Sequence, residues 1–391
     1  MSAQWIAQYP NGQTQIVMSS GGNLVSYLAS NGPTGDWSQI WTIDNVTDNT
    51  FPAITLDSNN QPAIVAPSTN GALQSFISVT LPMGTQELPI QIAPPGSVSG
   101  VLGIAIFPDG QILILAVGAS GGLYAFSSNG GSAPMPSAPI PGAGGVPANA
   151  SYAAAAISYV IGTSGNPASA NIYVVANIPA ILGNPTSGEL QLFTASYDFG
   201  SHTPIAAWQW SANPLAPAVT PSTPPVTLAP VSRPAIAVGA SGEVGVVSFG
   251  EVPGGESGLT YLAYWYIPSK GAILSLIKPV VFLLPLNTVS AGPSIAFDNN
   301  GTPHIPVISP PIAPKLEGDN FTITDRSSAE SSNQIGTYPA PGVVFTNATM
   351  ANGPNGEIDL YTTLTFDGTP TMNIYALLAG ASAWTAPGEI F

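Results

Sequence analysis

One pattern recurs along the chain: two short apolar stretches joined by a tight polar turn, then a second polar turn and a third apolar stretch. Residues 51–79, FPAITLDSNNQPAIVAPSTNGALQSFISV, show it in full. The turn segments SNNQ and STNG are rich in residues that tolerate positive φ or bond their own backbone. Because too few residues separate the turns for helices, the pattern predicts short antiparallel β-strands.

The pattern occurs seven times, and the first tight turn of each copy marks its place. These turns lie near Asn11, Asn59, Asp109, Gly165, Ser241, Asn300 and Asn355. They are about 48 to 76 residues apart, and 391 residues shared among seven copies give about 56 residues each. A four-stranded propeller blade needs roughly 40–50 residues plus its connections. The spacing therefore fits one blade per copy.

Several copies end in a fourth strand that often carries Trp. A broad aromatic side chain on a half-exposed outer strand can cover the gap to the next blade. We therefore expect a packing role for the Trp residues of these strands, namely Trp37, Trp41, Trp208, Trp210 and Trp384.

The sequence thus predicts an all-β chain, a seven-bladed β-propeller of four-stranded antiparallel blades that forms one domain over residues 1–391. A single blade has two apolar faces, and stacking the blades around an axis buries both and leaves few open sheet edges. A pair of β-sandwiches is the main alternative, and the regular spacing speaks against it. The expected blades span approximately 1–48, 49–97, 98–148, 149–230 with a proline-rich insertion at 213–230, 231–288, 289–340 and 341–391. The first and last copies are each nearly complete, so closure is expected from the packing of the two ends.

Charge narrows the classes of partner. Only 6% of the residues are charged, against about 25% in an average soluble protein. The chain has five Lys and Arg residues and 20 Asp and Glu residues, which give a formal net charge of −15. Nucleic-acid binding needs basic side chains that displace counterions from phosphates, so it is not expected. The most apolar stretch, residues 271–287, contains Lys278 and Pro285 and is shorter than the ~20 residues of a spanning helix, so no membrane insertion is expected.

Other features bear on the compartment. The chain has no Cys, which excludes a disulfide framework and a thiolate metal site. The first residues, MSAQWIAQYPNG, have no basic region and no long apolar core, so a signal peptide is not recognisable in this chain. The low charge leaves few groups that titrate and few tryptic sites. These properties suit an acidic, protease-resistant protein that is extracellular or exposed at a cell surface, although a general bias against Lys and Arg would explain them too.

Residues for catalysis are scarce. The two histidines, His202 and His304, lie in different copies, and structural roles are favoured for both. The motifs GxSxG, HExxH and GxxxxGK[ST] are absent. Turn formation explains Asp57, Asp109 and Asp298 better than calcium binding does, although calcium at a loop stays an open alternative. We expect no catalytic residue, no metal and no cofactor.

One segment differs from this background. Residues 314–334, PKLEGDNFTITDRSSAESSNQ, contain a large share of the charges of the chain. A long loop or an irregular outer hairpin is expected here, and long loops on a rigid scaffold often bind partners. The candidate partner-binding residues are Glu317, Asp319, Asp325 and Arg326. The alternative is a solvent-exposed segment that binds no partner.

The composition favours a non-catalytic surface binding protein with lectin-like carbohydrate recognition. Aromatic faces and neutral hydrogen-bonding side chains hold sugars, and the chain is rich in both. In repeat length and composition the whole chain resembles seven-bladed propeller lectins, without a sugar-binding motif specific to that class. The resemblance implies several neutral sites that bind a glycan or a surface protein with added avidity. The candidate stacking residues are Trp5, Tyr27, Tyr124, Trp265, Tyr266 and Tyr361, for which packing between blades is the alternative.

Two other functions stay open. A structural or attachment protein of a virion, filament or cell envelope would have the same low charge and the same lack of Cys. A propeller enzyme of the lyase or lactonase type would need acidic residues that converge on the central channel. The sequence alone does not identify a ligand or an oligomeric state.

Overall fold

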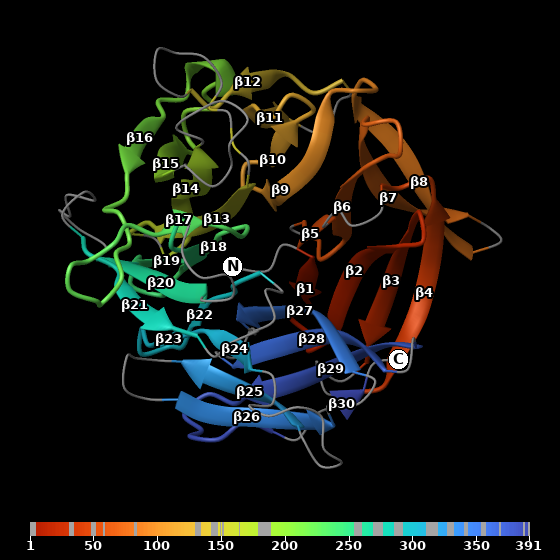
Figure 1. Ribbon diagram of the computed structural model, residues 1–391. Coiled ribbons are helices and arrows are strands. Elements are labelled where there is room, and N and C mark those ends of the chain that lie inside the picture. Colours follow the sequence, from red (N-terminus) through yellow and green to blue (C-terminus); the bar gives the residue numbers. More distant parts are fainter. Residues whose placement is uncertain are drawn as a thin grey trace.

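The strands pair in chain order into sheets that surround one axis (Figure 1). The computed structural model describes residues 5–30, 35–47, 52–57, 59–81, 84–129, 134–141, 148, 150, 152–163, 165–178, 189–253, 260–268, 277–284, 292–309, 320–326, 332–339, 343–352, 357–366, 369–385 and 388–389. The prediction of an all-β, seven-bladed propeller with four-stranded antiparallel blades is confirmed. No helix in the described part of the chain is long and apolar enough to cross a membrane.

Blades 1, 2, 3, 4 and 7 follow one plan, in which each strand pairs antiparallel with the next. Blade 1 consists of β1 (Ile6–Gln8), β2 (Thr14–Ser20), β3 (Asn23–Ala29) and β4 (Trp37–Asp44). Blade 2 consists of β5 (Ala53–Leu56), β6 (Pro62–Pro67), β7 (Leu73–Leu81) and β8 (Gly84–Ala93). Blade 3 consists of β9 (Val98–Ile106), β10 (Gln111–Gly118), β11 (Leu123–Asn129) and β12 (Ser137–Pro139). Blade 7 consists of β27 (Val343–Asn352), β28 (Ile358–Phe366), β29 (Thr369–Leu377) and β30 (Gly388–Glu389).

Blades 4 and 5 meet at the proline-rich insertion. Blade 4 consists of β13 (Tyr152–Ile161), β14 (Pro167–Ile178), β15 (Glu189–Asp198) and β16 (Ser211–Pro214), with the 3-10 helix η3 (Ile205–Ala207) before its last strand. Blade 5 consists of β17 (Ala229–Pro230), β18 (Ala235–Val238), β19 (Val244–Glu251), β20 (Thr260–Ile267) and β21 (Val280–Leu283). Both β17 and β18 pair with β19, so the end of the insertion adds a short fifth segment to this blade.

Blade 6 departs furthest from the plan. It consists of β22 (Ala296–Phe297), β23 (Pro303–His304), β24 (Pro306–Ser309), β25 (Asn320–Arg326) and β26 (Ser332–Pro339). The second strand is broken at Ile305, because β23 pairs with β22 while β24 pairs with β25. Of the two alternatives expected for residues 314–334, the described part forms the irregular outer hairpin and not the long loop, because β25 and β26 pair antiparallel with one irregularity.

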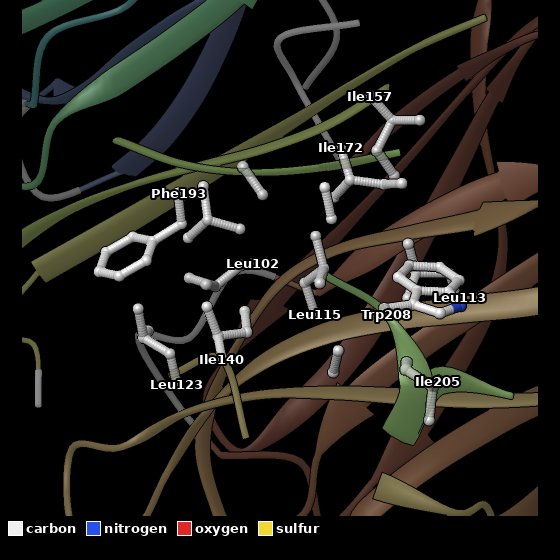
Figure 2. Close-up of a cluster of buried hydrophobic side chains, with 14 of the residues drawn as sticks. Leu102, Leu113, Leu115, Leu123, Ile140, Ile157, Ile172, Phe193, Ile205 and Trp208 are labelled. Carbon is white, nitrogen blue, oxygen red and sulfur yellow. The ribbon is translucent and has the colours of Figure 1, made fainter. Parts of the chain in front are cut away.

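A repeated pair of side chains fills the wedge between neighbouring blades. An aliphatic residue of the second strand stands opposite an aromatic residue of the third strand, and both belong to the core shared with the preceding blade. The pairs are Ile114 with Phe126, Val174 with Phe193, Val246 with Trp265 and Leu360 with Tyr375. Figure 2 shows Phe193 among Leu102, Leu123 and Ile140 of blade 3. Aromatic rings therefore serve mainly as packing elements in this fold.

The ring closes by packing of its two ends. In the described part of the chain, the sheet of blade 1 contains only strands from the N-terminal end and that of blade 7 only strands from the C-terminal end. Trp5 meets Tyr361 edge to face, with ring centroids 5.4 Å apart. One hydrophobic core contains Ile16 and Ile54 together with Met372 and Ile374.

Candidate functional site

The carboxylates of the turn aspartates accept hydrogen bonds from backbone amides. Oδ1 of Asp57 accepts hydrogen bonds from the amides of Asn59 and Gln61, each at 2.8 Å. Oδ1 of Asp298 accepts in the same way from two amides, and Oδ1 of Asp109 from one. The prediction that these aspartates form turns is therefore confirmed. Among the described residues, no group of three or more His, Cys, Asp or Glu side chains could hold a metal ion.

A pocket of about 450 Å³ lies between blades 2 and 3. It is bounded by the end of β8, by the connection that leads to β9, by the turn between β10 and β11, and by the segment before β12. Its apolar wall is formed by buried side chains that include Ile92, Phe126 and Met135. The hydroxyl-bearing residues Ser97, Ser120 and Ser137 also line it. We call this space the blade 2–3 pocket.

Tyr124 supplies the polar aromatic ring of the blade 2–3 pocket. It lies on β11 opposite Ala116 and is half-buried. A Cβ atom at Gly118 would lie 2.7 Å from Cε2 of Tyr124, so the ring rests directly on the backbone of this glycine. The amide of Ala119 donates to the carbonyl of Ser97 at 3.2 Å, which ties the β10–β11 turn to the connection from blade 2. Of the described residues that line the pocket, none carries a charge.

A second pocket of about 280 Å³ lies between blades 4 and 5, and we call it the blade 4–5 pocket. Leu215, Pro217 and Leu228 of the proline-rich insertion form part of its wall. Trp265 also lines it, and its indole Nε1 donates to the carbonyl of Ala216 at 2.8 Å. This indole therefore holds the insertion against blade 5. Glu189 is the one charged residue among the described residues of the lining.

The other candidate stacking residues line neither of these two pockets. Trp5 and Tyr361 are buried where blades 1 and 7 meet, and Tyr27 packs against the same core. Tyr266 is 45% exposed on β20 and meets Phe297 with its edge. Of the six candidates, Tyr124 lines the blade 2–3 pocket and Trp265 lines the blade 4–5 pocket, so neither pocket unites two of them among its described residues. Ser97 and Ser120 lie in two different connections and Ser137 begins β12, so no sequence pattern links these three serines.

The charged segment of blade 6 contributes a buried carboxylate. Asp325 is 1% exposed, and its Oδ2 lies 2.6 Å from Nδ1 of His304. Nε1 of Trp384 in blade 7 donates to the same oxygen at 3.3 Å, so Asp325 joins blades 6 and 7. Arg326 is half-buried, with its guanidinium 6.0 Å from the ring centroid of Phe282. Glu317 and Asp319 lie outside the described residues.

The two histidines differ in exposure. His304 lies on β23 and is 7% exposed. The side chain of His202 is 60% exposed, and its Nδ1 lies 3.5 Å from Oδ2 of Asp109. The same oxygen accepts a hydrogen bond from the hydroxyl of Tyr197 at 2.7 Å. Asp109 thus connects the first turn of blade 3 to blade 4.

Known structures share this architecture at low sequence identity. No protein-family model matches the chain, and no curated protein is significantly similar to it. The chain is similar to the BP39L lectin of Burkholderia pseudomallei, with a TM-score of 0.58, 14% identity and coverage of 100% of this chain and 99% of the lectin. It is also similar to an ulvan lyase, a polysaccharide lyase bound to a -[GlcA(1-4)Rha3S]- unit, with a TM-score of 0.52, 12% identity and coverage of 96% of this chain and 92% of the lyase. The chain is a seven-bladed β-propeller that resembles propeller lectins, and at these identities the likeness concerns the fold alone.

Proposed function

We propose that this protein is a non-catalytic surface binding protein that recognises neutral carbohydrate in the blade 2–3 pocket. The observation that carries the proposal is the lining of this pocket, which combines a tyrosine ring, an apolar wall and serine hydroxyls without a charged side chain among its described residues. Ligand sites are typically concave and largely apolar, with a few polar groups that set orientation. A pyranose ring offers one face of C–H groups to an aromatic ring and its hydroxyls to the serines.

The position of the second pocket supports a bivalent arrangement. Each pocket adjoins the connection that follows an outer strand, after β8 in one case and after β16 in the other. In antiparallel blades these connections lie on the same face of the ring. A glycan-covered surface could therefore meet both pockets at once, and linked weak sites bind more tightly than either site alone.

The test is a glycan array with free sugar as competitor, followed by calorimetry with the best ligand. We expect Tyr124→Ala to weaken binding by about tenfold or more, since losing one anchor side chain commonly costs over 1 kcal/mol. Tyr124→Phe is the matched control, because it keeps the ring and removes only the hydroxyl. Tyr266→Ala removes an exposed ring outside both pockets and should leave the affinity unchanged.

Two outcomes would contradict the proposal: no ligand on a broad array, or equal affinities for the wild type and Tyr124→Ala. Eliminative cleavage of an acidic polysaccharide by the wild type would favour the enzyme alternative, which stays open because a lyase shares the fold. Recovery of the protein within a filament, particle or envelope would favour the attachment alternative.

A further inference from the structure

A buried acidic group lies where the ring closes. We define the closure seam as Trp5 and Gln8 of blade 1 with Glu357, Asp359 and Tyr361 of blade 7. Asp359 is 0% exposed, and its Oδ2 accepts a hydrogen bond of 2.7 Å from Nε2 of Gln8. Its second oxygen and the hydroxyl of Tyr361 are both buried without a hydrogen-bond partner among the described residues. The last and first blades therefore meet through an incompletely satisfied polar contact.

Among the described residues, no basic side chain pairs with this carboxyl group. Lys and Arg occur only between residues 233 and 326, and the two histidines are residues 202 and 304. Blades 1 and 7 contain none of them. Across the ladder, Asp359 faces Ala351 on β27 and Ala376 on β29, neither of which ionises. The titratable groups that interact electrostatically with Asp359 are Glu357 and Tyr361, which lie two residues before and after it on the same face of the chain.

A carboxylate in this position is unfavourable for two reasons. Burial removes its hydration, and an ionised Glu357 repels it. Together these raise the pKa of Asp359 to about 8, although the hydrogen bond from Gln8 opposes the shift. A protonated carboxyl carries no charge to desolvate or repel, and its O–H can donate a hydrogen bond.

We propose that the closure seam is a proton-dependent lock, closed while Asp359 carries a proton and weakened when Asp359 ionises. The lock is a property of ring closure and does not depend on the proposed sugar site. In the part of the chain that the structure describes, no strand is shared between the two ends, so side-chain contacts such as this one hold blade 1 against blade 7.

The direction of the pH effect follows from linkage. An unfolded chain ionises Asp359 near pH 4, whereas the folded chain keeps its proton to about pH 8. Below pH 4 both states are protonated, so the contribution of this group does not change there. Between about pH 4 and pH 8, each increase of one pH unit lowers the ratio of folded to unfolded protein by up to about tenfold. Above pH 8 both states are ionised and the loss is complete.

The test compares urea unfolding of the wild type and Asp359→Asn at several pH values, in the presence of a chelator. Asn keeps the size of the side chain and an acceptor for Gln8 but cannot ionise. Between pH 5 and 8 we expect the folding equilibrium constant of the wild type to fall at least about 100-fold more than that of the variant. Asp57→Asn is the matched control, because Oδ1 of Asp57 bonds backbone amides in a turn, and it should follow the wild type.

Two further measurements keep the proposal falsifiable if Asp359→Asn does not fold. The ¹³C resonance of the Asp359 carboxyl in the folded wild type should report a protonated group at pH 6. Hydrogen exchange above pH 8, corrected for intrinsic rates, should accelerate in β1 and β28 more than in β10. An ionised carboxyl at pH 6, or parallel pH profiles of the wild type and Asp359→Asn, would overturn the proposal. Stabilisation of the wild type by calcium at pH 9 would also overturn it, because the seam would then hold a cation in place of the proton.

Discussion

Carboxylates of this chain take different roles according to the groups that surround them. Asp57 accepts two backbone hydrogen bonds in a surface turn, whereas Asp325 is buried against His304 and Asp359 is buried without a basic partner. The turn role could be predicted from the local sequence, because Asp57 is followed by Ser and two Asn residues, and Asp, Asn and Ser are typical of turns. The two buried roles could not, because their partners lie on other strands or another blade.

At the residue scale, Asp57→Ala should cost about 1–2 kcal/mol of unfolding free energy, because two backbone amides lose their shared acceptor. Asp57→Asn should stay within about 0.5 kcal/mol of the wild type, since its Oδ1 can accept the same bonds. Urea unfolding at pH 7 measures both changes. Equal losses for the two variants would show that charge, and not the turn hydrogen bonds, stabilises this position.

Gly118 offers a second prediction at this scale, because its missing side chain makes room for the ring of Tyr124. In Gly118→Ala the new Cβ would lie 2.7 Å from that ring, so the ring must move. We expect a loss of sugar affinity comparable to that of Tyr124→Ala, with an unfolding free energy within about 1 kcal/mol of the wild type, because the displaced ring lies beside open pocket space. Calorimetry and urea unfolding give the two values. Unchanged affinity would place the sugar away from this ring.

At the element scale, the unit of this fold is a four-stranded blade, and in blades 3, 4, 5 and 7 the third strand presents an aromatic ring to the preceding blade. The repeated turns and strand lengths were sufficient to predict four-stranded blades, whereas the aromatic ring on the third strand was not predicted. The broken strand at Ile305 and the fifth segment of blade 5 were not predictable from those features, because tertiary contacts decide which short segments pair. The pockets could not be predicted from the sequence either, because each pocket is lined by segments of two different blades.

The repeated aromatic position gives a prediction for the blade. Phe193 is fully buried between blades 3 and 4, so Phe193→Ala should cost about 3–5 kcal/mol. Tyr27 occupies the corresponding place in blade 1 but is only half-buried, and Tyr27→Ala should cost clearly less. Thermal and urea unfolding compare the two variants. If Tyr27→Ala were as damaging as Phe193→Ala, burial between blades would not determine the contribution of this position.

At the scale of the whole molecule, the seven blades are each made from one continuous part of the chain as far as the structure describes it. The stability of the ring therefore depends less on which blades the chain connects than on the contacts between neighbouring blades. Hydrophobic cores shared by adjacent blades occur around the ring, including the one that joins its two ends. The interface between blades 7 and 1, where the chain does not connect the blades, is therefore energetically comparable to the other six interfaces.

This view predicts that the break in the chain can be moved. A circular permutant would join the natural ends through a flexible linker of ~15 Gly and Ser residues and would begin in the connection between β12 and β13. Because no described strand would be divided, we expect a folded, cooperative protein whose Tm lies within about 5 °C of the wild type. Circular dichroism and calorimetry measure this, with a permutant cut inside β14 as the control that should not fold. If both permutants unfolded alike, or if the first lost cooperativity, blade 7 and blade 1 would need the natural chain ends in place, and closure by packing of complete blades would be wrong.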